Sequence, residues 1–184
     1  MKLSYLFEVF MLLRSFLPNL YTTDIYQIDI KVLKEKGIKG IITDLDNTLV
    51  AWDKPKATKS VEDWFQQLED YNINVIIISN NNEDRVKKFS QPLNIPYIHS
   101  ARKPLRKSFL RAAERMNLRT NEIAVIGDQV LTDVLGGNRG GFYTILVVPI
   151  VETDAPITKF NRFIERRILN YFRKRGKLEE VKNS

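Results

Sequence analysis

The sequence predicts a doubly wound α/β domain with a parallel sheet, and three observations lead to this prediction. Apolar runs rich in β-branched residues show no polar alternation, which is typical of strands covered on both faces. Stretches with helical periodicity separate the runs, as in a chain that alternates strands and helices. Three runs end in polar side chains, and domains of this class bind ligands at the carboxyl ends of their strands. The runs lie near residues 41–43, 74–78, 122–126 and 142–148.

Three helices are expected between these strands. Residues 58–70 begin with small polar residues suited to capping and carry apolar residues at helical spacing. Residues 83–89 form a shorter second helix. Pro104 is expected at the first position of a third helix, where proline is favoured, and an apolar stripe continues from Leu105 to Met116.

The turn after the first run carries two aspartates and a threonine, Asp44, Asp46 and Thr48. Two half-buried carboxylates so close in sequence repel each other unless a cation or a shared proton relieves them. A nucleophilic aspartate beside an acidic one suits phosphoryl transfer through a covalent aspartyl-phosphate, with a divalent ion offsetting the charge. The same spacing also occurs in ordinary turns, where Asp and Asn bond their own backbone, so the triplet alone leaves both interpretations open.

Further residues in order along the chain complete a resemblance. After the aspartate triplet come Ser79, Lys103 before a proline, Asp128 after a glycine, and Asp133 five residues later. This set resembles the four motifs of the haloacid-dehalogenase-like (HAD) phosphatases, and Ala-x-Lys-Pro as third motif is similar to subfamily IIIA. Residues 19–150 resemble the bacterial YqeG-type proteins, relatives of the phosphatidylglycerophosphate phosphatases. The resemblance implies a HAD-like Rossmannoid core.

The resemblance also implies catalytic roles. Asp44 would be the nucleophile and a ligand of Mg²⁺, and Asp128 would complete the metal shell. Asp46 would be the general acid and base, and its backbone carbonyl would also bind the metal. Lys103 would neutralise charge on the transferred phosphoryl group and on Asp44. Mg²⁺ is expected because every proposed ligand is a hard oxygen.

The remaining site residues have binding or supporting roles in this resemblance. Ser79 would bind phosphate oxygens at the start of the next helix, helped by Asn80, for which a plain helix-cap role is the alternative. Thr48 would brace the loop, and Asp133 would position Lys103 or a metal-bound water. His99 either approaches the substrate or is an ordinary loop residue.

Loop lengths bear on the substrate. Only 34 residues separate Asp44 from Ser79, and 23 separate Ser79 from Lys103, so neither gap has room for a cap domain. An uncapped, shallow site favours phosphate on something large that itself shields the reaction from water: a membrane lipid, a protein or a nucleic-acid end.

Composition sets further bounds. The chain has 184 residues, 43% of them hydrophobic, which suffices for one domain with terminal extensions. It has no cysteine, which excludes disulfides and a thiolate metal site. No apolar run reaches the ~20 residues that span a bilayer. We expect an N-terminal apolar helical extension over residues 1–35, the HAD-like phosphatase core over residues 36–150, and a basic amphipathic C-terminal helix over residues 151–184.

The two ends of the chain raise the question of membrane contact. Residues 159–184 hold nine Lys and Arg against three Glu, and the chain as a whole carries +7. Their apolar residues fall on one helical arc, which either rests on an anionic membrane or packs on the domain. Residues 3–17 are apolar without the features of a signal peptide, and either dip into the bilayer interface or cover the sheet.

These observations favour a Mg²⁺-dependent phosphomonoesterase that acts on a bulky or membrane-lipid phosphate such as phosphatidylglycerophosphate. A phosphatase of a soluble metabolite, protein or nucleic-acid phosphate is the alternative. A non-catalytic basic module that binds RNA or the ribosome is a third hypothesis, although such a module has no need of Asp46. We expect a cytoplasmic location, peripheral at the inner face of the membrane.

Overall fold

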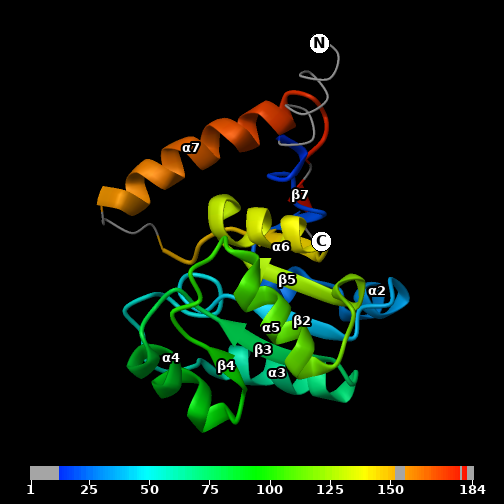
Figure 1. Cartoon of the computed structure of the whole chain (residues 1–184), viewed down its shortest axis with the longest axis vertical. Coiled ribbons are helices and arrows are strands. Elements are labelled where there is room, and N and C mark those ends of the chain that lie inside the picture. Colours follow the sequence, from blue (N-terminus) through cyan, green and yellow to red (C-terminus); the bar gives the residue numbers. More distant parts are fainter. Residues whose placement is uncertain (1–12, 152–155, 179, 182–184) are drawn as a thin grey trace.

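The structure, a computed structural model, describes residues 13–151, 156–178 and 180–181. Its centre is a seven-stranded sheet in which all paired strands run parallel (Figure 1). In spatial order the strands are β4 (Tyr97–Ile98), β3 (Asn74–Ile78), β2 (Gly40–Thr43), β5 (Ile123–Gly127), β6 (Tyr143–Val147), β1 (Leu20–Thr22) and β7 (Glu180–Val181). The four predicted runs become β2, β3, β5 and β6, the inner part of the sheet.

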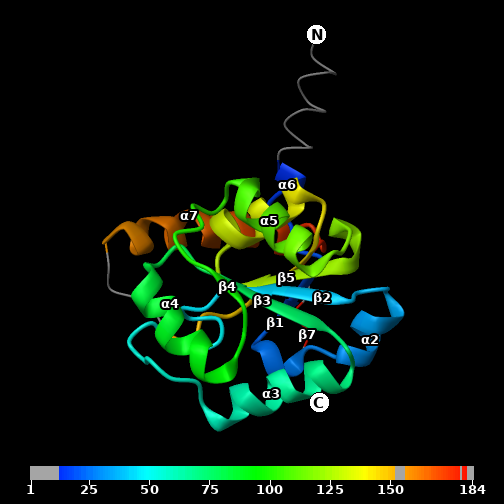
Figure 2. The same cartoon turned by 60° about the horizontal axis from the view of Figure 1, so that its bottom comes forward.

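Helices cover both faces of this sheet (Figure 2). On one face lie α5 (Arg106–Met116) and α6 (Leu135–Gly140), and on the other lie α2 (Ile30–Glu35) and α3 (Lys59–Asp70). Ile41 of β2 belongs to the buried cluster beneath α3, and its neighbour Ile42 belongs to the cluster beneath α5. Burial on both faces explains why the strands are apolar throughout. The predicted doubly wound parallel fold is confirmed.

Helix boundaries follow local capping. The Thr58 side chain accepts a hydrogen bond from the Val61 N–H and begins α3, as its sequence predicts. The Asn82 side chain begins α4 (Glu83–Ser90) in the same way. The prediction for the third helix was wrong at its start: α5 begins at Arg106, with Leu105 as its N-cap. Pro104 belongs instead to a turn, in which the Leu105 N–H donates to the carbonyl of Arg102 at 3.0 Å.

The chain ends add strands to the sheet. β1 pairs with β6, and β7 pairs with β1 at the sheet's edge. The described part of residues 1–35 therefore holds a strand besides α2, whereas a helical extension was expected there. Pairing with neighbouring strands satisfies the backbone of such short segments. Most of the apolar stretch 3–17 lies outside the described residues, and the division of the chain at residues 35 and 150 stays a prediction.

The last long helix packs on the domain. α7 (Pro156–Arg173) crosses near α6 at the β1 end of the sheet (Figure 1). Phe172 is buried in a cluster with Leu146 of β6, and Ile168 and Leu169 pack against that cluster. The sequence left open whether the apolar arc of this helix rests on a membrane or packs on the domain. For these residues the structure shows packing on the domain.

The connections beside the site are short. Between Asp44 and Ser79 the chain forms a turn, α3 and β3, and between Ser79 and Lys103 it forms α4, a short 3₁₀ turn and β4. Neither connection holds a cap domain, as predicted. Within the described part of the chain, no helix has the length and apolar character needed to cross a membrane.

Candidate active site

The candidate site lies where the strand order reverses. From β2 the chain continues to β3 and β4 on one side of the sheet, and then returns to β5 and β6 on the other side. Asp44 follows β2, Ser79 follows β3 and Asp128 follows β5, so three neighbouring strand ends bring these side chains together. The Asp44 N–H donates to the Ile126 carbonyl at 2.9 Å, which fixes the start of the turn on the sheet. An open cavity of about 370 Å³ lies at this point.

Lys103 forms the positive centre of the site. Its ammonium lies 2.8 Å from Asp44 Oδ1 and 2.6 Å from Asp133 Oδ1, and all three side chains are buried. Burial opposes the charge on Lys103, but the two carboxylates outweigh it and raise the pKa of Lys103 above its ordinary value. Lys103 is therefore a permanent cation beside Asp44.

Asn80 holds the backbone of Lys103 in place. The Asn80 side-chain oxygen accepts from the Lys103 N–H at 2.7 Å, and its amide donates to the Lys103 carbonyl at 3.3 Å. The alternative of a helix cap for Asn80 was wrong, because Asn82 caps α4. Asn80 also lines the cavity, so it connects the turn after β3 to the lysine.

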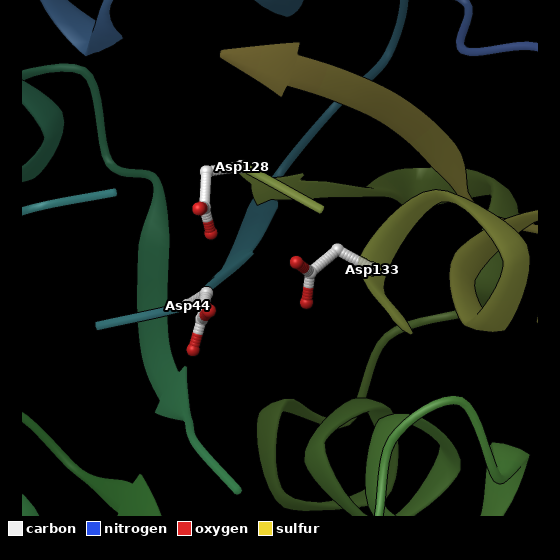
Figure 3. Close-up of side chains that lie close together, drawn as sticks. All are labelled: Asp44, Asp128 and Asp133. Carbon is white, nitrogen blue, oxygen red and sulfur yellow. The ribbon is translucent and has the colours of Figure 1, made fainter. Parts of the chain in front are cut away.

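Three buried carboxylates face one another beside this lysine. Oxygen atoms of Asp44, Asp128 and Asp133 lie within 4.8 Å of one another, and Figure 3 shows the three side chains close together. Burial raises the pKa of Asp44 to about 8 and that of Asp128 to about 6, although Lys103 opposes the first shift and an arginine opposes the second. A divalent cation would relieve this repulsion, and carboxylate oxygens are the ligands that Mg²⁺ prefers. The residues present therefore fit a divalent metal.

Glycine permits this close approach. A Cβ on Gly127, the last residue of β5, would lie 2.3 Å from Asp133 Cγ. Asp133 is part of a π-helical segment (Val130–Val134) that leads into α6, and its Oδ2 accepts from the Gln129 N–H at 3.2 Å. The glycine in the fourth motif thus makes room for the carboxylate that binds Lys103.

Asp128 has a partner that the sequence did not predict. The Arg162 guanidinium, on α7, forms an ion pair with the Asp128 carboxylate, and its Nη1 donates to the Asp128 carbonyl at 2.6 Å. Thr48 Oγ1 donates to Asp128 Oδ1 at 3.3 Å, which gives the predicted supporting residue a direct contact with a candidate metal ligand. Arg162 also pairs with Glu165 at 3.2 Å, and Glu165 Oε1 accepts from the Leu131 N–H at 3.0 Å.

The sequence shows the spacing of Arg162 and Glu165 but not the contact of Arg162 with Asp128. Glu165 is the single acidic residue within the sequence of α7, and it stands three positions after Arg162. Opposite charges three positions apart on a helix can pair with each other. Nothing in the sequence linked the pair to Asp128, because that contact joins residues 34 positions apart.

Asp46 lies apart from the carboxylate cluster. Its carboxylate accepts from Asn81 Nδ2 at 3.0 Å, in the turn before α4, and lies 2.8 Å from Nη2 of Arg85, in the first turn of α4. Asp46 lines the cavity and is partly exposed, unlike the buried Asp44. The structure thus separates the Asp46 carboxylate from the cluster. Asp133, for which only a supporting role was expected, belongs to the cluster.

Ser79 lines the cavity, whereas His99 lies outside the residues that line it. The Ser79 hydroxyl accepts from the Asn81 N–H at 3.0 Å in the turn before α4. The Nε2 atom of His99 is 3.6 Å from Glu83. The structure therefore gives His99 the position of an ordinary loop residue.

The doubly wound sheet, the four ordered motifs and the uncapped carboxylate–lysine site together define a phosphatase of the HAD type. The family described as mitochondrial PGP phosphatase matches residues 3–152, and the chain belongs to this family.

Comparisons with individual proteins agree with this membership. The chain is 53% identical over 169 residues to "Probable phosphatase YqeG" of Bacillus subtilis, covering 92% of this chain and 98% of that protein. It is 27% identical to the chloroplastic and mitochondrial phosphatidylglycerophosphate phosphatase 1 of Arabidopsis thaliana, covering 87% of this chain and 49% of that protein. The cobalt-bound deoxy-D-mannose-octulosonate 8-phosphate phosphatase of Haemophilus influenzae shares the fold, with a TM-score of 0.52 at 18% identity over 74% of this chain and 90% of that one.

Proposed function

We propose that this chain is a Mg²⁺-dependent phosphomonoesterase that works through an aspartyl-phosphate on Asp44. The observation that carries the proposal is the position of Asp44, which is buried 2.8 Å from the Lys103 ammonium and faces Asp128 and Asp133. A structural ion pair needs only one carboxylate per cation, whereas here three carboxylates share two cations, Lys103 and the Arg162 that pairs with Asp128, so net negative charge remains in a buried site. A metal-assisted reaction with an anionic substrate accounts for this arrangement.

The metal would be held by Asp44 and Asp128, together with the backbone carbonyl of Asp46. Asp133 stands close enough to hold a metal-bound water while it pairs with Lys103. When bound, Mg²⁺ would offset the combined negative charge of the carboxylates and the phosphate.

In the first half-reaction a carboxylate oxygen of Asp44 attacks phosphorus, and the bond from phosphorus to the ester oxygen breaks. Lys103 stabilises charge on the phosphoryl oxygens, and Ser79 binds one of them. Asp46 donates a proton to the departing ester oxygen, which leaves as an alcohol. The product of this half-reaction is phosphorylated Asp44.

In the second half-reaction water attacks the same phosphorus atom and Asp46 accepts a proton from it. Arg85 and Asn81 suit Asp46 to this step because they bind its carboxylate form and fix its direction. Phosphate leaves, and Asp44 regains its free carboxylate. A non-catalytic RNA- or ribosome-binding module gives no reason for this second aspartate.

The favoured substrate is a phosphate on a membrane lipid, with phosphatidylglycerophosphate as the first candidate. The open cavity without a cap domain and a relative named as a phosphatidylglycerophosphate phosphatase support this choice. Such an enzyme would work at the inner, cytoplasmic face of a membrane, in peripheral contact with anionic lipid. A soluble metabolite, protein or nucleic-acid phosphate is the competing substrate class.

The test is a phosphate-release screen with phosphatidylglycerophosphate in mixed micelles, glycerol phosphate, a nucleotide and a phosphopeptide. Each is assayed with Mg²⁺ and with a chelator, and Asp44→Asn is the control for contaminating phosphatases. We expect Mg²⁺-dependent release that is fastest from the lipid and absent in Asp44→Asn. Preference for a soluble phosphate would overturn the lipid substrate, and release that survives Asp44→Asn would overturn the assignment of the nucleophile.

A further inference from the structure

Large apolar side chains are exposed in several segments that adjoin the candidate site. Among the described residues, most of the large apolar side chains that are exposed lie in segments that leave the site. We call the following six residues the site rim: Trp52, Leu105, Val148, Ile150, Val151 and Phe163. Their exposed fractions range from 36% to 59%, so each presents apolar surface to its surroundings.

Hydrogen bonds tie two segments of the rim to the aspartate turn. Trp52 lines the cavity, and its N–H donates to Asn47 Oδ1 at 3.3 Å. The Ile150 N–H donates to the Asn47 carbonyl at 3.0 Å, so the segment after β6 lies against the same turn. Asn47 stands directly after Asp46 and adopts a left-handed conformation with φ 64°. One turn thus positions the general acid and two rim residues.

The other rim residues also adjoin residues of the site. Leu105 follows Lys103 by two positions, and Phe163 directly follows Arg162, which binds Asp128. The segment after β2 and the start of α7 lie on the same side of the molecule in both views, at the left of Figures 1 and 2. The rim residues thus belong to segments far apart in the sequence that each adjoin a residue of the site, and Trp52 lines the cavity itself.

The rim differs from the rest of α7. Phe172 is buried at 3% exposure, and Ile168 and Leu169 pack against its cluster, whereas Phe163 is 49% exposed. The apolar arc of the helix is thus occupied by the domain along its second half. Among the described side chains of α7, the large apolar one that stays exposed is Phe163, which directly follows Arg162.

Charge identifies the kind of partner. Exposed basic residues dominate the same segments: Lys54, Lys56, Arg102, Arg106, Arg166 and Arg167. Among the described residues of these segments outside the cavity, the acidic ones are Asp53 and the buried Glu165; Glu152 and Asp154, which follow Val151 in the sequence, lie outside the described residues. Apolar side chains flanked by cations match the two layers of an anionic bilayer surface, in which negative headgroups lie above acyl chains.

We propose that the site rim docks the protein on an anionic lipid bilayer, with the cavity facing the headgroups. The proposal rests on the proposed function, since a phosphatase of a lipid phosphate must reach that phosphate at the membrane surface. It places the membrane contact at the mouth of the site and not along the apolar arc of α7. Trp52 inserts at the level of the headgroups, where the amphipathic indole is favoured.

The experiment uses the full chain and vesicles of equal parts phosphatidylglycerol and phosphatidylcholine, with pure phosphatidylcholine vesicles for comparison. The rim variant is Leu105→Ser with Ile150→Ser. The matched control is Val32→Ser with Leu110→Ser, which removes two exposed apolar side chains from α2 and α5. Cosedimentation measures vesicle affinity, and the emission of Trp52 reports insertion, because Trp64 is buried at 3% exposure.

We expect binding to anionic vesicles that salt weakens, a blue shift of emission that Trp52→Phe removes, and at least a ~10-fold loss of vesicle affinity in the rim variant. The control variant should bind like the unmodified chain, and both variants should hydrolyse phenyl phosphate at an unchanged rate. Failure of the unmodified chain to bind, equal affinity of the two variants, or equal binding to pure phosphatidylcholine would overturn the proposal. Rim-dependent binding by a chain that hydrolyses no phosphate ester would instead overturn the proposed function and uphold the rim.

Discussion

Two aspartates only two positions apart in the sequence have different surroundings in the site. We call the buried part of the site around Asp44 its inner half and the partly exposed part around Asp46 its outer half. Asp44 is buried with the carboxylate cluster and Lys103, whereas Asp46 is partly exposed and binds Arg85. Between them Leu45 is fully buried in the core beneath α3, which anchors the turn while its neighbours reach different partners. Sequence proximity therefore says little about the electrostatic surroundings of either carboxylate.

The difference teaches how one turn supplies two chemical roles. A nucleophile must be held rigidly with its charge balanced, and the inner half supplies a permanent cation and buried walls for that purpose. A group that donates and accepts protons must exchange them with solvent, and the outer half leaves Asp46 in contact with the open cavity. Pairs of carboxylates in contrasting surroundings are a recurrent basis for dividing such roles.

Removing the inner carboxylate should have the largest effect. Asp44→Asn removes the nucleophile and with it the covalent route, so kcat should fall by more than ~10⁴-fold. Circular dichroism should show a folded protein. Asp53→Asn, an exposed carboxylate outside the cavity, is the matched control and should keep full activity. Metal-dependent turnover by purified Asp44→Asn would show that Asp44 is not the nucleophile.

The outer carboxylate should matter less, and only for some substrates. Asp46→Asn should lower kcat by ~10²–10⁴-fold on an alkyl phosphate, whose poor leaving group needs a proton, and leave KM nearly unchanged. With an activated aryl phosphate the formation of the phosphorylated enzyme should be almost unaffected. A pre-steady-state comparison of the two substrates checks this. An equal loss on both would show that the two halves do not divide the work as described.

Arg162 offers a test of the charge in the inner half. It pairs with Asp128 from α7, so Arg162→Gln should remove a cation that opposes metal binding. We expect Mg²⁺ to bind about fivefold more tightly in calorimetric titrations, equivalent to the ~1 kcal/mol typical of a partly exposed ion pair. Arg166→Gln, an exposed residue of the same helix, should change nothing. Weaker Mg²⁺ binding in Arg162→Gln would mean that the arginine helps to orient Asp128 for the metal.

The last prediction concerns pH, and it bears on stability rather than on catalysis. Burial raises the pKa of Glu165 from 4.5 to about 7, so the folded protein keeps a proton that the unfolded chain loses. This contribution to stability is complete below pH 4.5 and is lost as the pH rises toward 7, a change on the order of 3 kcal/mol. Glu165→Gln mimics the protonated form, so its Tm should exceed that of the unmodified chain increasingly over this range. If the Tm values of the two proteins changed in parallel with pH, a raised pKa of Glu165 in the folded protein would be contradicted.

Much of this site could be predicted because its signals are local. A strand that is apolar throughout and ends in a polar residue indicates the carboxyl edge of a parallel sheet, and this placed Asp44, Ser79 and Asp128. The motif order then brought in Lys103 and Asp133, which the structure confirms as an ion pair. Periodicity and the Thr58 cap gave α3 nearly residue by residue, and the bounds of α4 were predicted to within one residue although its cap is Asn82.

Other features could not be predicted, because their causes are not local. β1 and β7 have three and two residues, too few to show a pattern, and exist through pairing with distant strands. Arg85 and Arg162 look like ordinary basic helix residues until the fold brings them to Asp46 and Asp128. The same limit applied to the apolar arc of α7, whose partner could be identified only in three dimensions.

Trapping the intermediate tests the division between the two halves most directly. Asp46→Asn is mixed with Mg²⁺ and an activated aryl phosphate, quenched in acid within milliseconds, and digested for mass spectrometry. The account predicts that the peptide containing residue 44 accumulates one phosphoryl group, because the inner half can form the intermediate while the outer half no longer activates water. Absence of the phosphoryl group during turnover, or its appearance on any residue other than Asp44, would contradict the account.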